Sequence, residues 1–180
     1  GQHWVMNSLG ILAVVHAAGG DLGLAGLALG ELQPLPGRGR RLTIDVLGGN
    51  ALLIDEAYNA NPASMRSALA AMHNVPIEKS AKRVAVFGDM LELGENADEI
   101  HADLADAIKE AAITHLVLKG KHWMGLIERL SKDLPVYHLE DNQQLLAHAK
   151  SHFKPNDLIL AKGSNALSLG QFVEDLRDGK

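Results

Sequence analysis

The chain has 180 residues, of which 47% are hydrophobic and 4% aromatic, and its formal net charge is −5. This hydrophobic content suffices for a core and argues against disorder, while an acidic balance without a long basic run argues against nucleic-acid binding. There is no cysteine, which excludes disulfides and thiolate metal sites and fits a cytoplasmic protein.

Two helices are predicted at the start of the chain. Residues 4–18 carry apolar side chains at helical spacing and stop at Gly19-Gly20. Their longest apolar stretch is shorter than the roughly 20 residues that span a bilayer, so we expect no membrane insertion. A second short helix is predicted at 24–32, and the Pro-rich segment 33–37 breaks the pattern. We therefore expect a helical domain remnant over 1–33 and a second domain over 34–180.

Strands alternate with helices beyond the break. Strands are predicted at 41–46, 51–55, 82–87, 115–118, 136–139 and 158–161, and helices at 62–72, 97–111, 123–130, 142–152 and 169–176. This order indicates an α/β, Rossmann-like fold: a mostly parallel sheet with helices on both faces and an antiparallel edge hairpin. Ligands of such sheets bind beyond the carboxyl ends of the strands. That rule selects the loops 56–61, 88–96, 120–122 and 162–165.

The loop at residues 55–62 concentrates polar side chains. It reads Asp-Glu-Ala-Tyr-Asn-Ala-Asn-Pro and runs from a strand end into a helix start, where backbone N–H groups are unpaired. Carboxylates suit ribose hydroxyls, and a helix terminus with amides suits polar or anionic groups, so the loop predicts a nucleotide site. The alternative is turn chemistry, because Asn and Asp favour turns and caps without any ligand.

Several motifs in chain order resemble those of the Mur ligase family. Residues 55–65 are similar to the signature of the members that add D-alanyl-D-alanine, and 88–94 to their Gly-Asp-Met-x-Glu-Leu-Gly loop, which His101 follows at the family's spacing. Three further segments carry the resemblance. Residues 1–7 are similar to the segment that closes the central ATPase domain, 36–38 to the entry into the C-terminal domain, and 162–164 to a late Lys-Gly-Ser motif.

Three departures accompany this resemblance. Trp4 stands where the family usually has Asn, Asn165 follows the Lys-Gly-Ser motif where many members have Arg, and Glu56 replaces a second Asp. The contacts that the family assigns to the Asn at the position of Trp4 are therefore not carried over to this chain.

The resemblance implies a set of nucleotide contacts. Asn7 would contact adenine through its amide, and Arg38 would reach the ATP phosphates with its forked guanidinium. Either Asp55 or Glu56 would hold the ribose. Without the family, Arg38 beside a proline turn is an ordinary solvated residue.

A second set of residues is implied for substrate binding. It comprises Tyr58, Asn59, Asn61, Ser64, Asp89, Glu92, Lys162 and Ser164. Each also has a structural reading: we favour binding for Asn59 and helix capping for Asn61, and Lys162 would pair with a substrate carboxylate. Asp89 and Glu92 would hold a cation or the dipeptide ammonium, or else be solvated loop acids.

The nine histidines do not predict a metal site. They are scattered over different elements, and only His148 and His152 share helical i, i+4 spacing. We expect these two on an exposed helix without a third ligand, and His101 in a structural role.

The resemblance further implies an ATP- and Mg²⁺-dependent ligase acting on UDP-muramoyl tripeptide and D-alanyl-D-alanine through an acyl phosphate. The phosphate-loop pattern Gly-x-x-x-x-Gly-Lys-Ser/Thr is absent from these residues. We expect that loop, the magnesium-binding acid and the UDP-binding domain upstream of Gly1, and this piece alone to be inactive. The C-terminal domain would close as a lid about residues 32–37.

Two other classes of function remain open at this point. One is another ligase with the same fold, such as a sister Mur ligase or a folylpolyglutamate-type or cyanophycin-type enzyme; the run 58–62 argues against these, because they carry His-containing versions there. The other is a non-catalytic α/β ligand-binding module.

Overall fold

The computed structural model describes residues 2–180, with side-chain environments from Val5 onward. Gly1, which begins the predicted domain-closing segment, lies outside the described residues. The chain divides into two compact units, Gly1–Pro34 and Leu35–Lys180.

The first unit holds two helices, α1 (Gln2–Ala17) and α2 (Leu22–Glu31), which contact each other. Asp21 caps α2 by accepting a hydrogen bond from the N–H of Leu24 at 2.9 Å. The apolar side chains remain exposed: Leu9 by 54%, Val14 by 69% and Leu27 by 71%. This unit therefore buries little of its own apolar surface.

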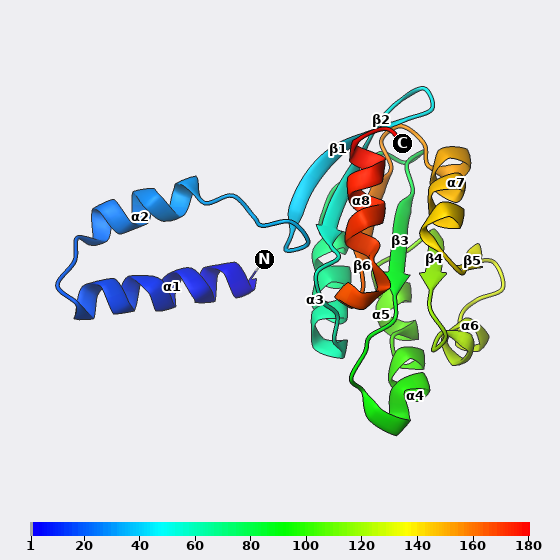
Figure 1. The fold of residues 1–180 in the computed structure, drawn as a ribbon, viewed down its shortest axis with the longest axis horizontal. Coiled ribbons are helices and arrows are strands. Elements are labelled where there is room, and N and C mark those ends of the chain that lie inside the picture. Colours follow the sequence, from blue (N-terminus) through cyan, green and yellow to red (C-terminus); the bar gives the residue numbers. More distant parts are fainter. Residues whose placement is uncertain (1) are drawn as a thin grey trace. The chain divides into compact units, whose positions relative to one another are not determined.

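The second unit is built on a six-stranded sheet in the order β1-β2-β6-β3-β4-β5 (Figure 1). The antiparallel hairpin pairs Arg40 with Asp55 and Val46 with Gly49, and the other neighbouring strands are parallel. The strands are β1 (Arg40–Val46), β2 (Gly49–Glu56), β3 (Arg83–Gly88), β4 (His115–Lys119), β5 (Val136–Leu139) and β6 (Leu158–Lys162). The predicted mostly parallel sheet with an antiparallel edge is confirmed.

Helices cover both faces of this sheet, because alternate strand residues point to opposite sides. Phe87 packs with Leu69 in one core, and Val86 packs with Phe172 in the other. The helices are α3 (Pro62–His73), α4 (Ala97–Ala102), α5 (Ala105–Glu110), α6 (Met124–Arg129), α7 (Asn142–His152) and α8 (Leu169–Arg177). The chain runs outward from β3 to β5 and then returns to place β6 between β2 and β3, which creates a crevice at the carboxyl ends.

The predicted single helix over 97–111 is wrong, because the structure divides it into α4 and α5 at Asp103-Leu104. Arg66 donates from Nη2 to the Asp103 carbonyl at 2.8 Å, and Arg129 donates from Nη1 to the Asp103 carboxylate at 2.8 Å. The carbonyl at the break is thus bonded from outside the helix. These partners lie far away in sequence, so helical periodicity could not reveal them.

The amino-terminal edge of the parallel strands holds a histidine cluster. His148 is buried, which corrects the expectation of an exposed helix face, and its Nε2 lies 2.7 Å from Nε2 of His115. His152 stacks on His148 with ring centroids 4.1 Å apart. Burial, with the neighbouring imidazole and Lys82 as further causes, lowers the pKa of His115 to about 4, and burial with His152 and Lys82 lowers that of His148 to about 4.

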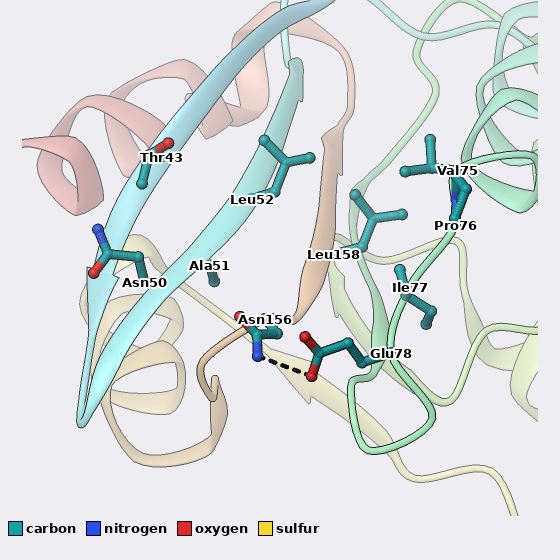
Figure 2. A pocket seen from close by; sticks show the side chains of 10 residues that line it. All are labelled: Thr43, Asn50, Ala51, Leu52, Val75, Pro76, Ile77, Glu78, Asn156 and Leu158. Carbon is teal, nitrogen blue, oxygen red and sulfur yellow. Dashed lines mark hydrogen bonds between the residues drawn. The ribbon is translucent and has the colours of Figure 1, made fainter.

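A small pocket of 330 Å³ opens at the same edge (Figure 2). Its floor is apolar, with Leu52, Ile77 and Leu158 among the lining residues. Two of its polar groups bond each other, since Asn156 donates from Nδ2 to Glu78 at 3.1 Å. No helix among the described residues is long and apolar enough to cross a membrane.

Candidate functional site

The loops beyond β2, β3, β4 and β6 meet at the carboxyl edge of the sheet. In sequence they are far apart, yet three buried polar side chains lie here: Asp55 near the end of β2, Asp89 directly after β3 and Lys162 at the end of β6, each at most 3% exposed. Exposed polar side chains lie around this buried set. The edge therefore combines a fixed polar base with groups that face solvent.

Asp55 fixes the segment that precedes β1, around Gly37, to the end of β2. Its Oδ2 accepts from the N–H of Gly37 at 2.7 Å and from Arg40 Nη2 at 3.1 Å, and its Oδ1 accepts from the N–H of Ala57 at 3.2 Å. Gly37 has φ of +74°, and a Cβ there would lie 2.7 Å from the Tyr58 nitrogen, so only glycine fits. Asp55 is thus committed to internal contacts.

Two nearby arginines differ in their surroundings. Arg40 is neutralised by Asp55 and Glu174. Arg38 is exposed, and its guanidinium carbon lies 4.0 Å from the centre of the Tyr58 ring, a cation–π arrangement. Among the described residues Arg38 has no carboxylate partner. Its N–H donors therefore face solvent.

Glu56, Asn59 and Lys162 form a second group. The Lys162 ammonium donates to the Asn59 carbonyl at 2.9 Å and to Glu56 Oε2 at 3.4 Å. Burial lowers the pKa of Lys162 from its ordinary value, and the Glu56 carboxylate opposes that shift. Lys162 is 2% exposed, so the structure places it beneath the loop, with Glu56 only part-buried above it.

Asn61 and Ser64 are occupied with capping α3. Asn61 Oδ1 accepts from the N–H of Ser64 at 2.8 Å, and Ser64 Oγ accepts from the N–H of Asn61 at 3.0 Å. This reciprocal pair is a capping box, and Pro62 follows at the first helical turn. Asn59, by contrast, is exposed, with its Oδ1 accepting from the N–H of Ala60.

Asp89 ties the β3 loop to the β4 loop. Its Oδ2 accepts from the N–H of Lys121 at 2.9 Å and its Oδ1 from the N–H of His122 at 3.3 Å. A Cβ on Gly120, whose φ is +127°, would lie 2.2 Å from this carboxylate. Glu92, the other acid of the loop, is exposed and has a left-handed backbone, with φ of +63°.

Ser164 and His101 complete these loop connections. Ser164 donates its N–H to the Asp89 carbonyl, and its Oγ accepts from the N–H of Leu91 at 2.9 Å. His101 Nε2 accepts from the N–H of Met90 at 2.9 Å, while Nδ1 bonds the Ala97 carbonyl at 2.6 Å. Burial lowers the pKa of His101, against the opposing effects of the Ala97 carbonyl and Asp89. This neutral imidazole holds the loop in place.

A pocket of 680 Å³ opens beside these loops. Asp89, Leu91 and Leu167 line one side, and the chain after β4 and β5 supplies the rest. Sequence reasoning missed three of its charged or titratable residues, namely Lys121, His138 and Glu140. The available signal was the end of two predicted parallel strands: Lys121 lies in the selected loop 120–122, and His138 and Glu140 lie at or directly after the end of the strand 136–139.

The remaining predicted residue, Asn7, is exposed on α1 in the first unit. Over the residues whose side chains are described, no group of three carboxylate or histidine side chains converges as a metal site.

The chain was compared with known proteins. A family model described as "Mur ligase, glutamate ligase domain" matches residues 40–165. UDP-N-acetylmuramoyl-tripeptide–D-alanyl-D-alanine ligase of Bacillus subtilis is 32% identical over 98% of this chain and 38% of its own. The Escherichia coli protein of the same name is 30% identical over 99% of this chain and 38% of its own.

Solved structures agree in architecture. A crystal structure of MurF from Acinetobacter baumannii matches with a TM-score of 0.82 and 26% identity, over 99% of this chain and 38% of that one. UDP-N-acetylmuramate–alanine ligase MurC from Thermotoga maritima, at 20% identity and a TM-score of 0.68 over 100% of this chain and 39% of that one, shares the fold. The chain thus spans little more than a third of the length of the relatives it matches.

Proposed function

Since the chain belongs to the Mur ligase family, we propose that it forms the carboxyl-terminal part of an ATP-dependent ligase that joins D-alanyl-D-alanine to UDP-N-acetylmuramoyl tripeptide. The tripeptide carboxylate attacks the γ-phosphorus of ATP and ADP leaves. The dipeptide amine then attacks the acyl phosphate, which releases phosphate and a proton and forms the amide. Cell-wall precursor synthesis of this kind would take place in the cytoplasm.

Arg38 carries the nucleotide side of this proposal. Its guanidinium is exposed, stacked and without an acidic partner among the described residues, and its fork matches phosphate oxygens. The ribose contact belongs to Glu56 and not to Asp55, because the Asp55 carboxylate already accepts three hydrogen bonds inside the fold. Asn7 on α1 remains our candidate for the adenine.

The dipeptide belongs in the 680 Å³ pocket. Lys121 can face its carboxylate and Glu140 its ammonium, since both line that space. His138 also lines it, but its Nε2 already donates to the Gly120 carbonyl. Asp89 shapes the pocket and does not bind the ammonium directly, because its two oxygens accept backbone hydrogen bonds. We give Asn61, Ser64 and Ser164 structural roles: the first two cap α3, and Ser164 holds the loop after β3.

Mg²⁺ would accompany ATP, where it neutralises the phosphates. We assign none of its ligands to this chain, because Asp89 already accepts two backbone hydrogen bonds and Glu56 pairs with Lys162. The central ATPase domain and the UDP-binding domain of the relatives would supply the remaining contacts. On ATP binding, residues 35–180 would close as a lid about residues 32–37.

The exposed Arg38, without a carboxylate partner among the described residues, is the observation that carries this proposal. Phosphate release by the full-length enzyme tests it. Release should require both UDP-muramoyl tripeptide and D-alanyl-D-alanine. Arg38→Ala should lower kcat/KM for ATP by about 100-fold, the typical loss for one charged donor at a reacting phosphate. Arg41→Ala removes an exposed charge three residues further along and should leave kcat/KM unchanged.

Other outcomes would redirect or end the proposal. Phosphate release with D-glutamate or diaminopimelate in place of the dipeptide would assign the enzyme to a sister ligase of the same family. Wild-type kcat/KM in Arg38→Ala would remove the phosphate contact. Phosphate release by the 180-residue chain alone would contradict the assignment of the phosphate loop to another domain.

A further inference from the structure

Arg38 is held in place both through the backbone on either side of it and through its side chain. At the backbone end, the N–H of Gly37 bonds the Asp55 carboxylate at 2.7 Å, and the N–H of Gly39 bonds the Asp55 carbonyl at 2.8 Å. The Gly37 carbonyl accepts from the N–H of Tyr58 at 3.1 Å. Residues on both sides of Arg38 are therefore fixed to the end of β2.

The side-chain end rests on an aromatic face. The Arg38 guanidinium carbon lies 4.0 Å from the centre of the Tyr58 ring, while the ring itself is 48% exposed. A long arginine side chain normally loses rotamer freedom when it is immobilised by a ligand. Stacking on a ring whose own backbone is anchored removes part of that freedom in advance, because the planar cation keeps its edge donors free while its face is held.

We propose that Tyr58 is a positioning residue for Arg38, holding the guanidinium where it meets the nucleotide phosphates. This inference rests on the proposed function. Tyr58 acts through its ring and not through its hydroxyl, so it does not itself touch ATP or the dipeptide. Its earlier reading as a substrate-binding residue is replaced by this indirect role.

A double-mutant cycle in the full-length enzyme tests the inference. Tyr58→Leu should lower kcat/KM for ATP by about two- to five-fold, which corresponds to the roughly 0.5–1 kcal/mol of an exposed cation–π contact. Tyr58→Phe keeps the ring and should restore the wild-type value. In the Arg38→Ala background Tyr58→Leu should cause no further loss. KM for D-alanyl-D-alanine should not move in either single variant at residue 58, and Tyr58→Phe should keep the wild-type melting temperature.

The opposite results overturn the inference. A Tyr58→Leu loss that persists undiminished in Arg38→Ala would show that the ring acts independently of the arginine, and an equal loss in Tyr58→Phe would transfer the role to the hydroxyl. Wild-type kcat/KM in Arg38→Ala would remove the contact that Tyr58 is said to position. Dipeptide-dependent phosphate release by the wild-type enzyme separates these failures from failure of the proposed ligase activity.

Discussion

The two edges of the parallel strands bury polar groups in different ways. At the carboxyl edge, Asp89 and Lys162 bond to loops that follow other strands, and Asp55 bonds the segment that precedes β1. The exposed Arg38 and the part-buried Glu56 lie around them. At the amino edge, the buried groups mainly satisfy one another. His115 and His148 bond each other through Nε2 atoms 2.7 Å apart.

This difference separates a candidate site from a structural polar cluster. Asp157 at the amino edge is as buried as Asp55, and it too accepts from backbone N–H groups, those of Lys82 and Lys154. Burial of a titratable side chain therefore does not identify a site by itself. A site also needs polar groups whose hydrogen-bonding capacity is left for a ligand.

The largest expected effect is a loss of stability in acid, caused by the histidines at the amino edge. Unfolded, His115 and His148 titrate near their ordinary value of 6.5, whereas in the fold both have pKa values of about 4. Between these values the unfolded chain binds more protons, so the free energy of unfolding should fall as pH drops from 6.5 to 4. The slope is at most about 1.4 kcal/mol per pH unit for each histidine.

Urea unfolding of the chain at several pH values measures this slope. His148→Gln should reduce it by at least half, because one of the two titrations is removed together with an imidazole that helps to lower the pKa of His115. Ser151→Ala, a change on the same helix that removes no titrating group, serves as the control and should leave it unchanged. A wild-type slope in His148→Gln would contradict the assignment of acid sensitivity to the histidine pair.

The carboxyl edge should respond to loss of one acceptor. Asp89→Ala leaves the N–H groups of Lys121 and His122 without their partner, at a cost on the order of 3 kcal/mol of unfolding free energy. Asp89→Asn keeps one acceptor oxygen and should cost roughly half as much. Chemical denaturation of the three proteins provides the comparison, and equal stability of all three would argue against a structural role.

The smallest effect is expected at the start of α3. Asn61→Ala removes the acceptor of the capping box and should lower stability by about 1 kcal/mol, whereas Asn61→Asp should retain the cap. In the full-length enzyme neither change should alter KM for the dipeptide. A raised KM in Asn61→Asp would return this residue to the binding site.

Most of the fold could be predicted because local signals agree with it. The strand Val136–Leu139 and the helix Asn142–His152 have the predicted boundaries. The break at Asp103 could not be predicted, because Arg66 and Arg129 reach it from other helices. The partners of His148 were hidden for the same reason, since His115 is 33 residues away.

The sequence predicts which loops form the candidate site, but it does not predict the role of each residue in them. Asp55 and Glu56 are adjacent, and strand alternation turns one into the core and the other outward. Both faces of β2 carry apolar residues, so the sequence pattern does not reveal which acid is buried. The stacking of Tyr58 on Arg38 joins segments 20 residues apart and required the folded chain.

Arg40 has a practical consequence for handling this protein. It bonds both Asp55 and Glu174, so the last helix is fastened to the same carboxylate that anchors Gly37. An affinity tag or fluorescent label that disturbs α8 would therefore also disturb Arg40 and, through Asp55, the anchor of Gly37 next to Arg38. The turn at Leu47, 76% exposed and at the far end of the hairpin, is a safer point of attachment.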